Sequence, residues 1–389
     1  MSTLKVDAIR HNSATSDAIT TAADGTCTAR ITGMTGGSGL SHRNLIINGG
    51  MKVAQRSTSK AITGYGYHTV DRFHTVANSS MTYAVTMSQE NDNPDGLGKS
   101  VKLLTTTAKT PSGSENYILR YIGEEQDISG AGLGTSSCKQ LTVSFSVKTN
   151  KTGTHGFQIY LYGNQPNMTV AYTVSSANTW ERKTITLPTY TTSYTHGADN
   201  AQGFMIDWNL SSGPDDIMAP YNWATGSSAA RGVTGQVNML DTVGNYFQLT
   251  NVQLEIGDTA TSFEHRSYQD ELAHCQRYFY KISAAASGTG SHKHIGTMQY
   301  YGGQYPYGKM LDLPVPMRTI PTGSFTGDIR AWTAAGSNNG SFTTINFDRN
   351  DNLFLGSNGS VTNQNSGGAG NATPITLYPS STMSADAEL

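Results

Sequence analysis

Apolar and polar positions alternate along most of the chain. In the stretch Leu141-Thr-Val-Ser-Phe-Ser-Val147 every second residue is apolar, and the residues between them carry hydroxyl groups. Because successive side chains of a β-strand point to opposite faces, this pattern predicts strands with one face on a core and one face in water. Similar stretches occupy residues 157–161, 180–187, 203–207 and 246–256. We therefore expect an all-β fold, with a jelly-roll β-sandwich over residues 41–266.

One segment departs from the period of two and predicts a helix. Ser267 followed by Asp270 is typical of a helix N-terminus. The positions that follow form one apolar stripe at helical spacing: Tyr268, Leu272, Cys275 and Phe279. We expect a connecting amphipathic helix over residues 267–283. Three copies of the chain would bury this stripe at a trimer axis, or the stripe packs on its own sandwich, and the sequence leaves both arrangements open.

The two ends of the chain differ from the predicted sandwich. Residues 1–40 hold a few short alternating stretches and a glycine-rich run at 33–39. They contain too few apolar residues to bury a core alone, which predicts an attachment arm and linker that a partner completes. Residues 284–389 return to alternating patterns among many Tyr, Gly and Asn residues. This region predicts a C-terminal β tip domain with a long loop at 356–370.

Composition excludes several functions. The chain has 389 residues, a net charge of -2 and 14% charged residues. Nucleic acids and anionic membranes require a basic face, so neither is an expected partner. No apolar run reaches the roughly 18 residues of a membrane span, and the first residues lack the apolar core of a signal peptide. Cys27, Cys138 and Cys275 are odd in number and lack metal-binding spacing, so we expect reduced thiols.

Adjacent carboxylates are the candidates for a polysaccharide-degrading site. They are Glu124 with Glu125 and Asp215 with Asp216. A glycosidase places two carboxyl groups across a cleft, whereas neighbours on a strand point to opposite faces. We expect solvated turn or edge residues instead. The chain also lacks a GxSxG motif and a phosphate-binding loop. We therefore predict no catalytic residue, no cofactor and no enzymatic activity.

Two further patterns each leave a choice open. His292 and His294 are two positions apart, so a strand would place both on one face. A parallel trimer would then gather the imidazoles of three copies around an octahedral metal, or the two residues simply flank a turn. Exposed aromatic rings stack on sugars, or they serve ordinary packing. The candidate rings are Tyr300, Tyr301, Tyr305, Tyr307, Trp208 and Trp223.

Several stretches together resemble a domain common in phage fibre and appendage proteins. Arg43-Asn-Leu-Ile-Ile-Asn-Gly-Gly-Met-Lys-Val-Ala-Gln-Arg56 is followed by Asp71-Arg-Phe73. Phe263-Glu-His-Arg-Ser-Tyr268 runs into Glu271-Leu-Ala-His-Cys-Gln-Arg-Tyr278. Further stretches of the resemblance are 141–148, 151–154, 178–183, 248–257 and 313–318. Residues 5–9 and 18–26 resemble the N-terminal arm of structural proteins of short-tailed marine phages, so the resemblance covers nearly all of residues 1–320.

The resemblance implies a virion protein with a carbohydrate-binding-module-like jelly roll, and it carries over no catalytic or binding residue. The expected function is a structural, homotrimeric tail fibre or appendage subunit for host attachment. Residues 1–40 would anchor it to a phage tail or capsid protein, and residues 284–389 would face a host cell-surface glycan or protein. The alternatives are a capsid or head fibre or decoration protein without a receptor role, and a polysaccharide depolymerase.

Overall fold

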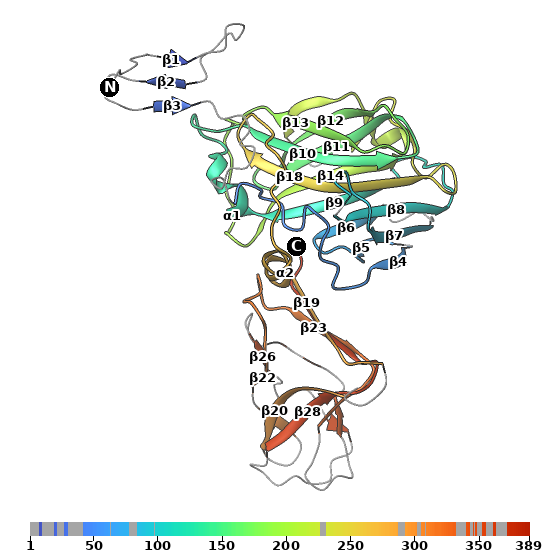
Figure 1. The fold of residues 1–389 in the computed structure, drawn as a ribbon, viewed down its shortest axis with the longest axis vertical. Helices are drawn as coiled ribbons and strands as arrows, with labels where there is room; N and C mark the ends of the chain where they lie inside the picture. Colours follow the sequence, from blue (N-terminus) through green and yellow to red (C-terminus); the bar gives the residue numbers. More distant parts are fainter. Residues whose placement is uncertain are drawn as a thin grey trace, which may run out of the picture.

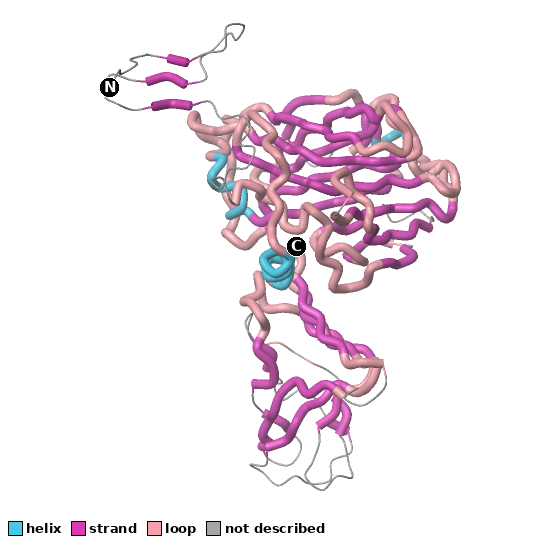
Figure 2. Tube along the Cα trace, viewed as in Figure 1, coloured by secondary structure: helices cyan, strands magenta, loops and turns pink. Residues whose placement is uncertain are grey.

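The computed structural model describes most of the chain. The described residues are 8–9, 19–21, 27–29, 42–62, 64–77, 84–96, 98–225, 231–286, 292–301, 305–307, 309–331, 340–342, 345, 347, 352–354, 361–362 and 372–389. Nearly all regular structure in them is β (Figures 1 and 2), which confirms the predicted fold class. None of the described helices is long and apolar enough to span a membrane.

The body of the molecule is a sandwich of two antiparallel sheets. The six-stranded sheet has the order β13 (Glu181–Leu187), β10 (Leu141–Thr149), β18 (Tyr246–Ile256), β8 (Ser100–Thr107), β7 (Ala84–Glu90) and β4 (Ser59–Ile62). The seven-stranded sheet has the order β16 (Tyr221–Thr225), β12 (Pro166–Val174), β11 (Gly153–Leu161), β14 (Gln202–Ser212), β9 (Asn116–Glu124), β6 (Phe73–Ala77) and β5 (Gly66–Tyr67). Shorter elements lie beside the sheets: α1 (Glu125–Ile128), η1 (Ser129–Ala131), η2 (Pro214–Asp216), β15 (Ile217–Met218) and β17 (Gly232–Val233).

The alternating residues of the strands build the core between the sheets. Val143, Phe145 and Val147 of β10 are fully buried. The ring of Trp208 from β14 meets Phe145 edge-on, with ring centroids 5.7 Å apart. Each large apolar side chain buried in this way stabilises the fold by about 1.5–3 kcal/mol. The hydroxylated residues Thr142, Ser144 and Ser146 of the same strand point to the opposite face, but they are also buried, so the expectation that this face lies in water is wrong for this strand.

The connecting helix is shorter than predicted. Helix α2 spans Tyr268–Gln276, and the side chain of Ser267 accepts a hydrogen bond from the backbone N–H of Asp270 at 3.1 Å. The prediction of a helix as far as residue 283 is wrong, because Phe279–Ser283 forms strand β19. This strand pairs antiparallel with β29 (Thr382–Asp386), so a partner about a hundred residues away overrides the helical spacing of the apolar residues.

The apolar side of α2 packs on the sandwich of its own chain. Cys275 and Tyr278 are buried in a small cluster with Ile47 and Val53, and Leu272 packs against its edge. Tyr268, the first residue of the predicted stripe, is 55% exposed. Of the two arrangements that the sequence leaves open, the structure therefore has the packing within one chain. Cys275 and the half-buried Cys138 are free thiols.

A second core lies in the C-terminal domain. Its strands form three sheets with the orders β19-β29-β23, β21-β20-β28-β24-β25-β27 and β22-β26. Their bounds are β20 (Lys293–Tyr301), β21 (Tyr305–Tyr307), β22 (Lys309–Asp312), β23 (Thr322–Thr326), β24 (Ile329–Ala331), β25 (Gly340–Phe342), β26 (Asn352–Phe354), β27 (Val361–Thr362) and β28 (Ala372–Leu377). Strand β27 interrupts the predicted loop at 356–370, whose other residues lie outside the described ones, as does the predicted linker at 33–39.

The two ends of the chain occupy different places on the molecule. Strands β1 (Ala8–Ile9), β2 (Ile19–Thr21) and β3 (Cys27–Ala29) form a small antiparallel sheet. Figure 1 shows this sheet outside the sandwich at the upper left, and β20 and β28 below the sandwich. The C-terminus does not lie at the far end of the tip domain. It returns beside α2, where the tip domain meets the sandwich.

Candidate functional site

A groove of about 430 Å³ opens on the outer face of the six-stranded sheet. Because Val143, Phe145 and Val147 point into the core, the alternate residues of β10, including Ser146, face this outer surface. Strands β13 and β18 flank β10 in the same sheet. The groove is lined by Pro94, Asp95, Ser146, Trp180, Arg182, Asn251, Ser262, Phe263 and His265. It thus combines aromatic rings with hydroxyl, amide and guanidinium groups.

Trp180 is held in place by the neighbouring charges. Its indole N–H donates to Oδ1 of Asp92 at 3.1 Å. The ammonium of Lys148 donates to Oδ2 of the same carboxylate at 2.8 Å and lies 5.8 Å from the centre of the indole ring. Burial tends to raise the pKa of Asp92, but the hydrogen bonds from Lys148 and Trp180 outweigh it and lower this pKa. The half-buried ring therefore has a fixed orientation beside the groove.

The aromatic side chains of Phe263 and His265 belong to the segment that follows β18 and is hydrogen-bonded to it. Their rings meet edge-on, with centroids 5.0 Å apart and planes at 86°. Glu264 between them anchors the segment, because its backbone N–H donates to Gln253 at 2.8 Å and its carboxylate accepts from the backbone N–H of Asn44 at 2.9 Å. Two anchors on Glu264 thus fix both aromatic neighbours.

A β-bulge places Asn251 in the groove. Between β10 and β18 the register shifts, so that Asn251 and Val252 together oppose Phe145. Asn251 has a φ of 52°, the left-handed conformation that the extra residue of a bulge often adopts and that Asn tolerates better than most residues. A bulge of this kind redirects a side chain, here toward the lining of the groove.

The lining suits the binding of a polyhydroxylated ligand. Aromatic ring faces pack against the C–H surfaces of sugars, and the polar side chains offer partners for hydroxyl groups. Arg182 already donates to Oγ of Ser144 at 3.2 Å and to the carbonyl of Thr261, so part of its hydrogen-bonding capacity is used within the protein. Asp95 is the one carboxylate among the lining residues, whereas glycoside hydrolysis requires two.

The predicted solvated carboxylates Glu124 and Glu125 are in fact buried. Glu124 accepts hydrogen bonds from Arg277 at 2.9 and 2.8 Å and from the hydroxyl of Tyr278. Glu125 accepts from the hydroxyl of Tyr194 at 3.1 Å and lies 2.7 Å from Nδ1 of His196. The prediction is wrong because the partners come from distant segments, and buried carboxylates need such partners.

Asp215 and Asp216 differ in their exposure to solvent. Asp215 is exposed, as predicted. Asp216 is buried and accepts from Oγ of Ser212 at 3.0 Å and from Nδ2 of Asn116 at 3.2 Å. Burial raises the pKa of Asp216, and these hydrogen bonds oppose the rise. The three buried carboxylates of the two pairs, Glu124, Glu125 and Asp216, therefore have structural roles that the sequence pattern does not reveal.

The described residues include the side chains of two of the six predicted aromatic candidates, Trp208 and Trp223. Trp208 is fully buried in the core and is not available to a ligand. Trp223 is half-buried, packs edge-on against Tyr190 and donates to the carbonyl of Pro188 at 2.7 Å. The side chains of Tyr300, Tyr301, Tyr305 and Tyr307 lie outside the described residues. Trp180 was missed as a ring candidate, although it belongs to the stretch 178–183 that carries the resemblance.

His292 and His294 lie at the start of β20, and both are exposed. The ring of His292 meets Tyr378 edge-on at 4.5 Å, while His294 is opposite Thr376 next to a bulge in the β20–β28 pair. Among the described residues of a single chain, no three metal-binding side chains come together. The shared metal site requires three chains, so it stays one of the two open alternatives.

No family model matches the chain, and no curated protein matches it. Among solved structures, the enzymatically active domain of tailspike protein 4 of bacteriophage CBA120 is 14% identical, with a TM-score of 0.31. That alignment covers 55% of this chain but 21% of the tailspike chain. The family 11 carbohydrate-binding module of a Clostridium thermocellum cellulosomal cellulase is 14% identical, with a TM-score of 0.27, and 54% of this chain covers 100% of the module. The xylan-binding domain of Paenibacillus barcinonensis Xyn10C is 9% identical, with a TM-score of 0.24 and coverages of 54% and 99%.

Proposed function

We propose that this chain is a structural subunit of a phage appendage that binds a glycan on the host surface. The observation that carries the proposal is the groove on the six-stranded sheet, where Trp180 and Phe263 stand beside Ser146 and Asn251. Rings beside hydroxyl and amide groups match the alternating C–H and hydroxyl surfaces of a sugar. Trp180 and Phe263 also belong to two of the stretches that resemble phage fibre proteins.

The chain binds the glycan without cleaving it. Asp95 is the one carboxylate that lines the groove, while Glu124 and Glu125 are occupied by arginine, tyrosine and histidine partners inside the protein. A retaining or inverting glycosidase needs a pair of free carboxyl groups about 5–9.5 Å apart across its cleft. Incubation of the purified chain with host polysaccharide should therefore release no reducing ends. Release of reducing ends would favour the depolymerase instead.

Residues 1–40 anchor the subunit to a phage tail or capsid protein. Strands β1, β2 and β3 are two or three residues long, too short to bury a core of their own. A partner that adds a strand or covers a face would complete this small sheet. Two further copies of the chain, in a homotrimer, would provide such surfaces, and the assembled subunit would belong to the virion.

A glycan-binding measurement tests the groove. The purified full chain and its Trp180→Ala variant are applied to an array of bacterial surface glycans, with Tyr65→Ala as the matched control. Tyr65 is 79% exposed and does not line the groove. Loss of one stacking ring should weaken binding by about tenfold or more, since aromatic anchors commonly contribute more than 1 kcal/mol. Equal binding by Trp180→Ala and the parent would contradict the site.

A further inference from the structure

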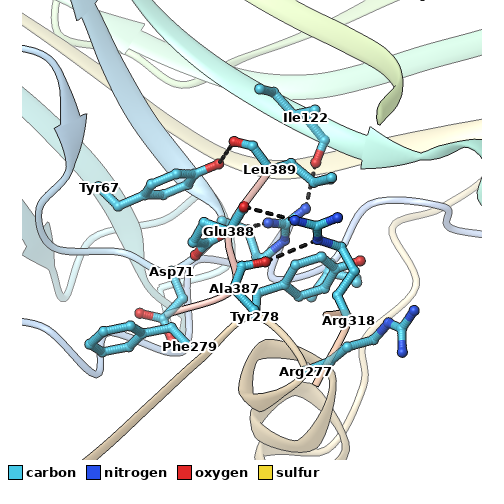
Figure 3. Close-up of polar contacts among 12 residues, drawn as sticks. Tyr67, Asp71, Ile122, Arg277, Tyr278, Phe279, Arg318, Ala387, Glu388 and Leu389 are labelled. Atoms are coloured by element: carbon cyan, nitrogen blue, oxygen red, sulfur yellow. Dashed lines mark hydrogen bonds and ion pairs between the residues drawn. The ribbon is translucent and has the colours of Figure 1, made fainter. Parts of the chain in front are cut away.

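The joint between the sandwich and the tip domain gathers residues from five distant segments. Arg56, Arg72, Tyr278 and Arg318 stand in four different stretches that carry the resemblance, and each contacts the last residues of the chain. Figure 3 shows Tyr278 and Arg318 beside Ala387, Glu388 and Leu389. The chain crosses this joint twice, first through α2 and β19 and then through β29 and the residues after it. Interactions at this point therefore decide how the tip domain is held.

Arg72 is the centre of the joint on the side of the sandwich. It is fully buried, with a φ of 71°, a backbone conformation that is strained for a bulky residue. Its guanidinium forms an ion pair with Glu388 and donates to the carbonyl of Ile122. It also lies 3.4 Å from the centre of the Tyr278 ring. The charge of Arg72 is thus neutralised by a residue next to the end of the chain.

The last four residues, Asp386 to Leu389, contact arginine and tyrosine side chains from several other segments, and we call them the C-terminal strap. Arg318 donates to the carbonyls of Ala387 and Glu388 at 2.9 and 3.0 Å. Arg56 pairs with the carboxylates of Asp386 at 3.0 Å and Glu388 at 3.3 Å. Two further contacts complete the set: the hydroxyl of Tyr67 donates to Leu389 at 3.4 Å, and the backbone N–H of Ala387 donates to the carbonyl of Tyr278 at 2.8 Å.

The strap also covers the apolar side of the joint. Leu389 packs against the buried cluster of Ile47, Val53, Cys275 and Tyr278. Cys275 is completely buried there, and burial raises the pKa of its thiol well above the ordinary value. A thiol in this state reacts only when the cluster opens. The rate at which a thiol reagent labels Cys275 therefore reports how often the joint opens.

We propose that the C-terminal strap is a latch that fixes the tip domain to the sandwich. When the strap detaches from Arg56, Arg72 and Arg318, the tip domain changes its orientation relative to the sandwich. The alternative is that α2 and the contact between Arg277 and Glu124 hold the joint without the strap. The latch goes beyond glycan binding, because it concerns the angle at which the tip domain is presented. It is independent of the groove and of the particle to which the chain belongs.

Labelling of Cys275 with a water-soluble maleimide tests the latch. Cys27→Ser and Cys138→Ser together give a full-length parent in which Cys275 is the one thiol. Two strap variants are made in this parent, a deletion of residues 387–389 and Glu388→Gln. Asp328→Asn is the matched control, because Asp328 pairs with Arg330 on the surface of the tip domain. Both strap variants should be labelled about tenfold faster than the parent, and the control at the rate of the parent.

Hydrogen exchange separates opening of the joint from global unfolding. In the strap variants, peptides of α2 should exchange faster while peptides of the core strand β14 keep the rate of the parent. Labelling of the deletion variant within about twofold of the parent would overturn the latch. Faster exchange in β14 to the same extent as in α2 would overturn it as well, because the strap would then support the whole fold.

Discussion

At the scale of single residues, Arg72 belongs to a local motif, but its structural role depends on a residue far away in the sequence. Asp71-Arg-Phe73 is visible in the sequence as part of a resemblance, yet its acceptor Glu388 lies 316 positions away. Burying a cation without a partner is prohibitive, so the presence of Arg72 in a buried strand start requires a carboxylate that the sequence cannot identify. Long-range ion pairs of this kind, like that of Glu124 with Arg277, are what the sequence analysis missed.

Arg72→Met tests the cost of breaking the buried pair. The variant removes the closer of the two cations that pair with the buried Glu388 and leaves Arg56 at 3.3 Å, and we expect the free energy of unfolding to fall by about 3 kcal/mol. Arg330→Met is the matched control, because its pair with Asp328 is about one third exposed and such pairs contribute about 1 kcal/mol or less. Urea unfolding followed by circular dichroism measures both. Equal losses in the two variants would contradict the central place of Arg72.

At the scale of elements, alternation predicted the strands and missed their partners. The stretch 141–147 lies within β10, and its apolar residues face the core as expected. The helical spacing after Ser267 predicted α2, but Phe279 belongs to β19 because pairing with β29 satisfies its backbone. The bulge at Asn251 has no sequence signal at all, since it depends on the register of two strands that are distant in the chain. The position of the groove could therefore not be predicted from the sequence, although Trp180 and Phe263 both belong to stretches that carry the resemblance.

Buried histidines in the sandwich predict a loss of stability in acid. Burial lowers the pKa of His68 and His155 to about 4 and that of His74 to about 3. Unfolded histidine binds a proton near pH 6.5, so the stability from these groups is present above that pH and is lost as the pH falls toward the folded values. Burial raises the pKa of Asp71 and Asp127 to about 6 and also raises that of Asp216, and these shifts act in the opposite direction.

The net expectation is that the free energy of unfolding is lower at pH 5 than at pH 7, by about 2–3 kcal/mol. His74→Asn should reduce this difference by about 2 kcal/mol, because it removes one group that the unfolded state protonates. His294→Asn is the control, because that side chain is exposed in β20. Urea unfolding at pH 5 and pH 7 measures the free energy of unfolding of each variant. If His74→Asn leaves the difference between the two pH values unchanged, the histidine is protonated in the folded protein at pH 5, and the prediction is wrong.

At the scale of the whole molecule, the N-terminal strands and the tip domain lie at different places around the sandwich (Figure 1). The small sheet of β1, β2 and β3 lies outside the sandwich at the upper left, and the labelled strands of the tip domain lie below the sandwich (Figure 1). The sequence predicted an arm and a tip domain, but it did not predict that residues 386–389 return to the sandwich. Removing the tip domain would therefore also remove the partner of Arg72.

Deletion of residues 1–40 tests the anchoring role of the arm. We expect phage particles to lack the truncated chain, because the strands that a partner would complete are gone. The sandwich should stay folded, since its core is built from residues after 45. Immunoblotting of purified particles measures incorporation, and circular dichroism of the purified chain is the control for folding. Normal incorporation of the truncated chain would place the anchor elsewhere.

Binding of the purified full chain to intact host cells tests the central claim of a glycan-binding appendage most directly. The fluorescently labelled chain, Trp180→Ala and Tyr65→Ala are added to cells of the host before and after periodate oxidation of surface glycans. The account predicts that the chain and Tyr65→Ala bind untreated cells, that periodate abolishes this binding, and that Trp180→Ala binds about tenfold more weakly. Undiminished binding to periodate-treated cells, or full binding by Trp180→Ala, would contradict it.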